Sequence, residues 1–313
     1  MAARSLVSFV LYNRGMKIIS EGAIMKADLL FDCKQELAEG IIWDAKERRL
    51  LWVNIHEGEI WQSKDGAAPT CVKFDEKVGS FCIRTAGGFA LATASGFALI
   101  DAGFQSFRSV ALVERDLRST RLNDGRCDRQ GRFVAGGICD AEGRPAISAV
   151  YRLDPDLSVE KIISNVSIGN SICFSLDGAT MYFTDMPTGN IMMFDYDVST
   201  GKVSNGRVFT DGDGEPGLPD GSVIDSEGFL WNARWGGARV SRFNKEGRVD
   251  RHVDVPVSQV SCVGFGGDTY NDLFITTAWY QMTPEQRAAE PLSGGIFKTK
   301  VDVPGVAEVR FGG

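Results

Sequence analysis

Four oxygen-bearing side chains recur in the sequence, each 10 to 13 residues ahead of an aromatic residue in an apolar segment. They are Glu39, Asn123, Asn170 and Asp220, which precede Trp52, Phe133, Tyr182 and Trp231 respectively. A buried carboxylate without a partner is costly, so Glu39, beside Gly40 at the start of an apolar segment, needs a counter-charge. Carboxylate and amide oxygens suit Ca²⁺, Mg²⁺ or Mn²⁺ better than a structural zinc ion. The set therefore predicts one site for a divalent cation, if the fold brings its members together.

Each of these residues also has an ordinary explanation, because Asp-Gly and Asn-Asp-Gly are common turn sequences. Taken singly, Asp220-Gly221 and Asn123-Asp124-Gly125 would be interpreted as turns. Their common position relative to the repeat favours a functional site instead. A cation held by few protein ligands keeps positions open for water and substrate, where it can polarise a carbonyl group and acidify a bound water.

The apolar segments recur with a regular period. Their markers, separated by 39, 42, 49, 49 and 43 residues, are Trp52, Leu91, Phe133, Tyr182, Trp231 and Phe274. A period of roughly 40–50 residues is typical of the blades of a β-propeller. We therefore predict an all-β protein, a six-bladed β-propeller with four-stranded antiparallel blades over residues 26–313. The regular period argues against a β-sandwich or two small β domains. The innermost strand of each blade lines a central channel, where Ser80 and Cys262 would occupy the position of the four polar residues in the other two blades.

The composition of the 313 residues excludes several classes of function. The net charge is −7 and basic residues do not cluster, so nucleic acid is an unexpected partner. The seven cysteines include no CxxC pair, which indicates reduced thiols in a cytoplasmic protein. An apolar run from Leu6 is too short to span a membrane, and residues 1–25 are predicted to be an extension or a start assigned too early. Two histidines and no GxSxG motif leave little material for a Ser-His-Asp triad, and we expect His56 to lie exposed in a hairpin turn.

Five segments in order resemble the regucalcin/gluconolactonase (senescence marker protein) family of six-bladed sugar lactonases. They are LAEGIIWD, RLNDGRCDRQGRFVAG, SIGNSICFSLDGATMYFTD, LPDGSVIDSEGFLWNARWGG and SCVGFGG, and the resemblance runs from about Ala27 to the C-terminus. It implies that Glu39, Asn170 and Asp220 are the metal ligands. It also implies that Arg121 and Asn123 hold substrate oxygens, that Asp220 is the general base, and that residues 27–32 close the ring by pairing with the last blade.

The sequence departs from the family pattern at three places. Asn170-Ser171 stands where the family usually has Asn-Gly, AEG replaces GEG before Ile41, and Asn54 replaces a common aspartate. None of these changes removes an expected ligand.

The expected activity is hydrolysis of an aldonolactone to the aldonic acid with one divalent cation, whether calcium, magnesium, manganese, zinc or iron. A neutral sugar lactone is the default substrate. A lactone bearing a phosphate or sulfonate group is expected if Arg234 reaches the pocket. Two alternatives remain: a non-catalytic propeller that binds calcium or another ligand, and a propeller esterase that acts on other lactones. The sequence leaves the oligomeric state open.

Overall fold

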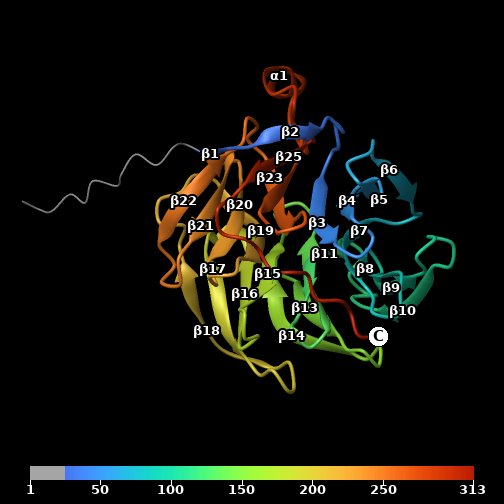
Figure 1. Ribbon diagram of the computed structural model, residues 1–313. Coiled ribbons are helices and arrows are strands. Elements are labelled where there is room, and N and C mark those ends of the chain that lie inside the picture. Colours follow the sequence, from blue (N-terminus) through green and yellow to red (C-terminus); the bar gives the residue numbers. More distant parts are fainter. Residues whose placement is uncertain (1–24) are drawn as a thin grey trace, which may run out of the picture.

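The structure, a computed structural model, describes residues 25–313 as a ring of six blades around a central axis (Figure 1). The predicted six-bladed β-propeller is therefore confirmed. The predicted extension, residues 1–25, lies outside the described residues except for Met25. Among residues 25–313, no helix combines the length and the hydrophobicity that a membrane span requires.

Each of the first four blades is a sheet of four consecutive strands. Blade one contains β3 (Ala38–Asp44), β4 (Arg49–Asn54), β5 (Glu59–Lys64) and β6 (Thr70–Lys73). Blade two contains β7 (Val78–Ile83), β8 (Phe89–Thr93), β9 (Gly96–Ile100) and β10 (Arg108–Leu112). Blade three contains β11 (Thr120–Cys127), β12 (Phe133–Cys139), β13 (Ser148–Leu153) and β14 (Val159–Val166). Blade four contains β15 (Gly169–Phe174), β16 (Thr180–Asp185), β17 (Ile191–Tyr196) and β18 (Val203–Thr210).

The last two blades combine both ends of the described chain, which closes the ring. Blade five contains β19 (Leu218–Ile224), β20 (Leu230–Trp235), β21 (Arg239–Phe243) and β22 (Val249–Asp254), and β1 (Met25–Lys26) adds in parallel to β22. Blade six contains β23 (Val260–Gly266), β24 (Asp272–Thr277) and β25 (Ile296–Lys300), and β2 (Asp28–Phe31) pairs antiparallel with β25 as its outermost strand. The predicted pairing of residues 27–32 with the last blade is thus confirmed.

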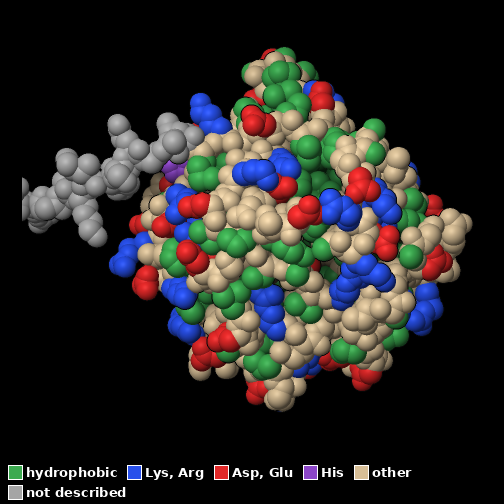
Figure 2. Space-filling model, viewed as in Figure 1, with side chains coloured by type: hydrophobic (Ala, Val, Ile, Leu, Met, Phe, Trp, Pro, Cys, Tyr) green, Lys and Arg blue, Asp and Glu red, His purple; other side chains and the backbone are tan. Residues whose placement is uncertain are grey.

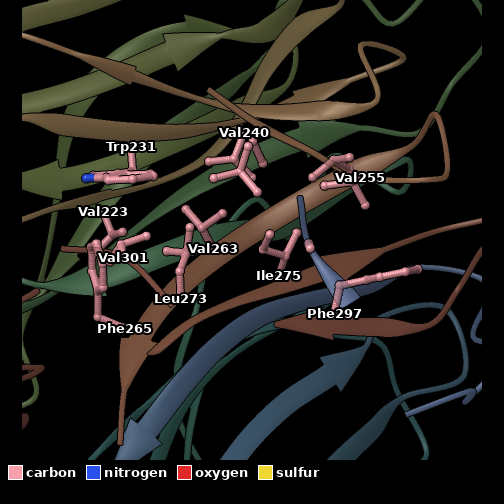
Figure 3. Packing of buried hydrophobic residues seen from close by; sticks show 14 of the residues in the cluster. Val223, Trp231, Val240, Val255, Val263, Phe265, Leu273, Ile275, Phe297 and Val301 are labelled. Carbon is pink, nitrogen blue, oxygen red and sulfur yellow. The ribbon is translucent and has the colours of Figure 1, made fainter. Parts of the chain in front are cut away.

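The six predicted marker residues all lie in the second strand of a blade, as the repeat requires. The strand before each marker is the innermost one: β3, β7, β11, β15, β19 and β23 surround the axis (Figure 1). The blades pack face to face through apolar side chains. Figure 3 shows one such interface, in which Trp231 and Val240 of blade five face Val263, Leu273 and Ile275 of blade six. This burial of apolar area on both faces of each sheet holds the ring together.

Every inner strand contains a one-residue bulge near its start. The pairing register shifts after Glu39, after Asn170, and in β11 and β19 around Asn123 and Asp220. Gly40 and Ser171, which follow Glu39 and Asn170, both have a φ of 58°. A bulge re-aims side chains and commonly lies beside a functional site. All four polar residues therefore lie at a bulge. Glu39 and Asn170 come directly before the register shift, whereas Asn123 and Asp220 lie within it, so the two pairs differ by one position.

The C-terminal segment crosses the end of the channel at which the inner strands finish (Figure 1). It forms isolated bridges with blade five (Asp225 to Gly305) and blade two (Arg84 to Phe311), and Phe311 is fully buried. We call residues 301–313 the C-terminal plug. On this face, acidic and basic side chains are interspersed (Figure 2). The opposite end of the channel, where the inner strands begin, carries the predicted site.

Candidate functional site

A pocket of about 240 Å³ opens where the inner strands begin, and we call it the mouth pocket. All five residues predicted for the site line it: Glu39, Arg121, Asn123, Asn170 and Asp220. They come from blades one, three, four and five. The sequence predicted that these side chains would converge at one end of a channel, and the structure brings them together there. Their individual roles stay predictions.

Glu39 of blade one and Asp220 of blade five line the same pocket, close enough for the charge of Glu39 to raise the pKa of Asp220. Both carboxyl groups are buried, and Glu39 Oε2 accepts from the Gly40 amide at 3.0 Å. Burial raises the pKa of Glu39, and the nearby Asp124 raises it further. Burial likewise raises the pKa of Asp220, with Glu39 and Asp124 adding to the rise. The cause is that two like charges in a desolvated site cannot both ionise without a counter-ion. Among residues 25–313, neither carboxylate forms an ion pair with a basic side chain.

This donor set fits a hard divalent cation. Glu39 and Asp220 supply two carboxylates, and Asn170 adds an amide oxygen at the same pocket wall. A bound dication would hold both carboxylates ionised and remove the repulsion between them. No histidine lines the mouth pocket, so the oxygen-rich set suits calcium, magnesium or manganese.

Asn123 orients Asn170 by a direct hydrogen bond. Its Nδ2 donates to Asn170 Oδ1 at 2.7 Å and to the Gly169 carbonyl oxygen at 3.1 Å. Its Oδ1 accepts from Arg121 Nη1 at 2.8 Å. Both amide protons of Asn123 are therefore engaged. The contact leaves Asn170 Oδ1 one further lone pair for a cation, and it makes Asn123 a positioning residue as well as a pocket wall.

Arg121 is buried but keeps one nitrogen free. Its Nε donates to Asp140 Oδ2 at 3.1 Å, and its Nη1 donates to Asn123 and to the Leu122 carbonyl oxygen. Its Nη2 has no partner among residues 25–313. Because the guanidinium is planar and already fixed by Asp140, this nitrogen is a pre-oriented donor for an oxygen in the pocket.

The backbone around Asp220 is held by a small buried network of hydroxyl and amide groups. Ser171 Oγ donates to the Asp220 carbonyl oxygen at 2.5 Å, and Asn232 Nδ2 donates to the same oxygen at 3.0 Å. Ser171 thus replaces the glycine expected from the family pattern: it adopts the left-handed backbone and adds a hydrogen bond to the neighbouring blade. Gly221 lies directly against Cys262, so the inner strands of blades five and six approach closely here.

The expectation that His56 is exposed was wrong, and the condition that Arg234 reaches the pocket is not met. His56 is half-buried rather than exposed: its ring contacts Tyr280 edge-on at 4.6 Å, and Tyr280 lines the mouth pocket. Burial, followed by the charges of Arg121 and Lys77, lowers the pKa of His56 to about 4. Arg234, the condition for a charged substrate, does not line the pocket. It is buried beneath the 212–217 loop, where it donates to the Gly217 carbonyl oxygen at 2.8 Å and to Asn232 Oδ1 at 3.2 Å.

Several residues that line the mouth pocket lie in loops outside the repeated segments, so the period of the sequence could not locate them. Arg144 lies in the β12–β13 loop, Met186 follows β16, and Tyr280 and Gln281 precede α1 (Pro284–Ala289). The segment around α1 lies between β24 and β25 and interrupts blade six.

The fold and the mouth pocket together define a class: six-bladed propellers with an oxygen-rich site at one end of the channel. The chain belongs to the SMP-30/gluconolactonase/LRE-like family, whose characteristic region matches residues 37–279.

Two sequence relatives and one solved structure illustrate the relationship. An L-arabinolactonase from Azospirillum brasilense is 37% identical over 295 residues, covering 92% of this chain and 96% of the relative. Regucalcin from Xenopus laevis is 34% identical over 287 residues, covering 89% and 95% of the two chains. The crystal structure of regucalcin from Agrobacterium tumefaciens, described as a calcium-binding protein, matches with a TM-score of 0.87 at 29% identity, over 93% of this chain and 99% of that one.

Proposed function

We propose that this protein is a metal-dependent lactonase that opens a sugar-acid lactone to the aldonic acid. The observation that carries the proposal is the pair of buried carboxylates, Glu39 and Asp220, which line one pocket open to solvent and form no ion pair with a basic side chain among residues 25–313. A relative named as an L-arabinolactonase supports the substrate class, and a similar structure described as calcium-binding supports a divalent cation.

The cation would be held by Glu39, Asn170 and Asp220. When bound, it supplies a positive centre that polarises the lactone carbonyl group and lowers the pKa of a water molecule. The oxygen-rich donor set places calcium, magnesium and manganese ahead of zinc and iron.

Asp220 is proposed as the general base. A neighbouring positive charge keeps its carboxylate ionised, and in that form it accepts the proton of the attacking water. The water oxygen bonds to the carbonyl carbon, the ring carbon–oxygen bond breaks, and the ring oxygen takes the proton from Asp220 and leaves as a hydroxyl group. The net release of one proton at neutral pH accompanies formation of the free carboxylate. A lactone is an activated ester, so this route needs no covalent nucleophile.

Arg121 and Asn123 are proposed to position the substrate. Arg121 Nη2 is free to donate to a hydroxyl or ring oxygen, while Asp140 holds the guanidinium in place at 3.1 Å. Asn123 contributes mainly by fixing Arg121 and Asn170, since both of its amide protons are already engaged. Orientation of this kind lowers the barrier by reducing the freedom lost in the transition state.

A cytoplasmic location is also part of the proposal. All seven cysteines are free thiols, and five of them are buried in the blades. Unpaired thiols are usual in a reducing compartment.

Acid release from a panel of sugar lactones tests the proposal. The purified protein is treated with a chelator and then supplied separately with Ca²⁺, Mg²⁺, Mn²⁺, Zn²⁺ or Fe²⁺, and proton release is followed with an indicator. We expect hydrolysis above the spontaneous rate, its loss with chelator and its return with at least one cation. Cation binding without acid release would favour a non-catalytic binding propeller, and activity on aryl esters alone would favour an esterase.

A further inference from the structure

A second arginine, Arg144, lines the mouth pocket without a partner. It lies in the loop of residues 140–147 between β12 and β13, and it is half-buried. Its side chain forms no ion pair and no hydrogen bond with residues 25–313. Arg121, in contrast, is paired with Asp140 at 3.1 Å. An unpaired guanidinium on the wall of a pocket is a candidate for binding an anion from solution.

The backbone holds Arg144 in place. Its amide donates to the Ala141 carbonyl oxygen at 3.0 Å, and its carbonyl oxygen accepts from Ser167 Oγ at 2.5 Å. Its φ of 43° lies in the left-handed region, which a long side chain adopts infrequently. The charge of Arg144 contributes to lowering the pKa of Arg121 and of His56, after the larger effect of burial on each. The guanidinium therefore lies on the blade-three side of the pocket, near both residues.

The charges that line the pocket favour an anion once a cation is bound. Three carboxylates, those of Glu39, Asp140 and Asp220, share the wall with the guanidinium groups of Arg121 and Arg144. A bound dication would leave one positive charge in excess. Glu39 and Asp220 would neutralise the cation and Asp140 would neutralise Arg121, so the excess lies at Arg144.

We propose that Arg144 binds an anionic group on the substrate, so that the preferred lactone carries a carboxylate, phosphate or sulfonate group away from the reacting carbonyl. This inference rests on the proposed lactonase function. It assigns to Arg144 the role that Arg234 would have had if it reached the pocket. The forked guanidinium can donate two parallel hydrogen bonds to any of these oxyanions.

A neighbouring groove offers the main competing position for the anion. It shares Arg121 and Asp140 with the mouth pocket and adds Lys73, Lys77 and Arg118. Lys73 is paired with Glu57 at 2.6 Å and Lys77 with Asp140 at 3.2 Å. Arg118 is exposed and has no ion pair among the described residues, so it provides a direct comparison with Arg144.

Steady-state kinetics on matched lactones test the inference. The substrates are gluconolactone, its terminal phosphate ester and glucarolactone, which carry no charge, a phosphate and a carboxylate respectively. In Arg144→Gln we expect kcat/KM for the charged lactones to fall on the order of ten- to a hundred-fold, the usual value of a hydrogen bond to a charged group. The value for gluconolactone should change little. Arg144→Lys should keep part of the preference, because it keeps the charge but loses the fork.

Two control variants separate this effect from general electrostatics. Arg115→Gln removes the same charge from an exposed position that lines neither pocket, and should leave all three substrates unaffected. Arg118→Gln should also spare the preference; if it alone removes the preference, the anion binds in the neighbouring groove and the inference is wrong. Comparison of the phosphate and carboxylate substrates shows which oxyanion the pocket prefers.

Binding of phosphogluconate, measured by calorimetry on wild type and Arg144→Gln, gives a readout that does not depend on turnover. We expect measurable binding that weakens in the variant. Equal rates on neutral and charged lactones in wild type, or an equal loss on all of them in the variant, would overturn the inference and leave the lactonase proposal intact. Arg144-dependent binding of phosphogluconate without hydrolysis of any lactone would refute the lactonase proposal instead, and absence of both would refute both.

Discussion

The two ends of the central channel differ in whether buried charged side chains have ion-pair partners. Beneath the channel, Arg126 is paired with Glu308 of the C-terminal plug, and Asp44 accepts from Arg310 at 2.7 Å and from Arg49 at 3.2 Å. At the mouth, the buried carboxyl groups of Glu39 and Asp220 form no ion pair with a basic side chain among residues 25–313. The chain therefore supplies counter-charges for the buried carboxylate of Asp44 and the buried guanidinium of Arg126 at the plug, and omits them for Glu39 and Asp220 at the mouth.

This difference separates a structural role from a functional one. A buried ion pair formed within the protein holds elements together and leaves no charge for a ligand. Two buried carboxylates without a counter-charge destabilise the empty protein, and such strain persists where a ligand relieves it. The plug thus seals the ring, and the mouth is prepared for a cation and a substrate.

The largest expected effect is at the mouth. Asp220→Asn keeps the size of the side chain and its place against Gly221 but removes the proposed base and one ligand charge. We expect lactone hydrolysis to fall by about a hundred- to ten-thousand-fold, the usual contribution of a general base. Proton release and circular dichroism of the same preparation measure activity and fold. Asp116→Asn, at an exposed position, is the matched control; a folded Asp220→Asn protein with the wild-type rate would remove Asp220 from the mechanism.

The second-largest expected effect is a loss of stability at the C-terminal plug. Glu308→Gln leaves the charge of Arg126 buried without its partner, and breaking a buried pair in this way costs roughly 3 kcal/mol of unfolding free energy. The lower end of the usual range applies because the Glu308 side chain is 17% exposed. Urea denaturation measures the loss. Lactone hydrolysis by the folded variant should stay near wild type, and a selective loss of activity without loss of stability would contradict the division between the two ends.

A third test uses pH and chelation together. In the cation-free protein the raised pKa values of Glu39, Asp220 and Asp124 mean that the folded state binds more protons than the unfolded state. Their contribution to stability is present below the ordinary carboxyl pKa and is lost as pH rises, for Glu39 between 4.5 and about 8. We therefore expect the Tm of chelated wild type to fall across this range relative to that of Asp220→Asn. An activating cation should abolish the fall, because it keeps the carboxylates ionised.

The outcome that contradicts this test is a pH-independent difference between wild type and Asp220→Asn in chelator. Saturation with the activating cation should also raise the Tm of wild type, by an amount equivalent to about 2.7 kcal/mol at a hundred times Kd. Asp220→Asn should show a much smaller rise at the same cation concentration. An equal rise in both proteins would place the cation elsewhere.

The smallest expected effect is a minor loss of stability, again at the C-terminal plug. Arg310→Gln removes one of two partners of Asp44, but Arg49 remains within 3.2 Å of the carboxylate. The Arg310 side chain is 32% exposed, so its ion pair is screened by solvent. We expect a loss of about 0.5–1 kcal/mol, typical of a partly exposed pair. A loss as large as that of Glu308→Gln would show that the plug depends on both pairs equally.

The sequence predicted the ring and the location of the site because both follow from periodicity. A marker residue in the second strand of every blade places the preceding strand at the axis, and this located Glu39, Asn123, Asn170 and Asp220 before any contact was known. It did not predict that Asn123 would donate to Asn170 Oδ1, because the two residues lie in different blades and their bulges differ by one position. It also left Arg144 unnoticed, and it made a charged substrate conditional on Arg234, which does not line the pocket.

The amino-acid sequence by itself determined the six blades, the closing strand β2 and the set of polar residues at the mouth, because hydrophobic alternation and repeat spacing are local properties of the chain. Only the tertiary structure decided which charged side chains near the mouth pocket lack a partner. Arg234 donates to loop carbonyl oxygens, Arg121 donates to Asp140 and keeps Nη2 free, and the Arg144 side chain has no partner among the described residues. Whether a buried charge is compensated depends on neighbours that folding brings from other blades, and spacing along the chain carries no record of them.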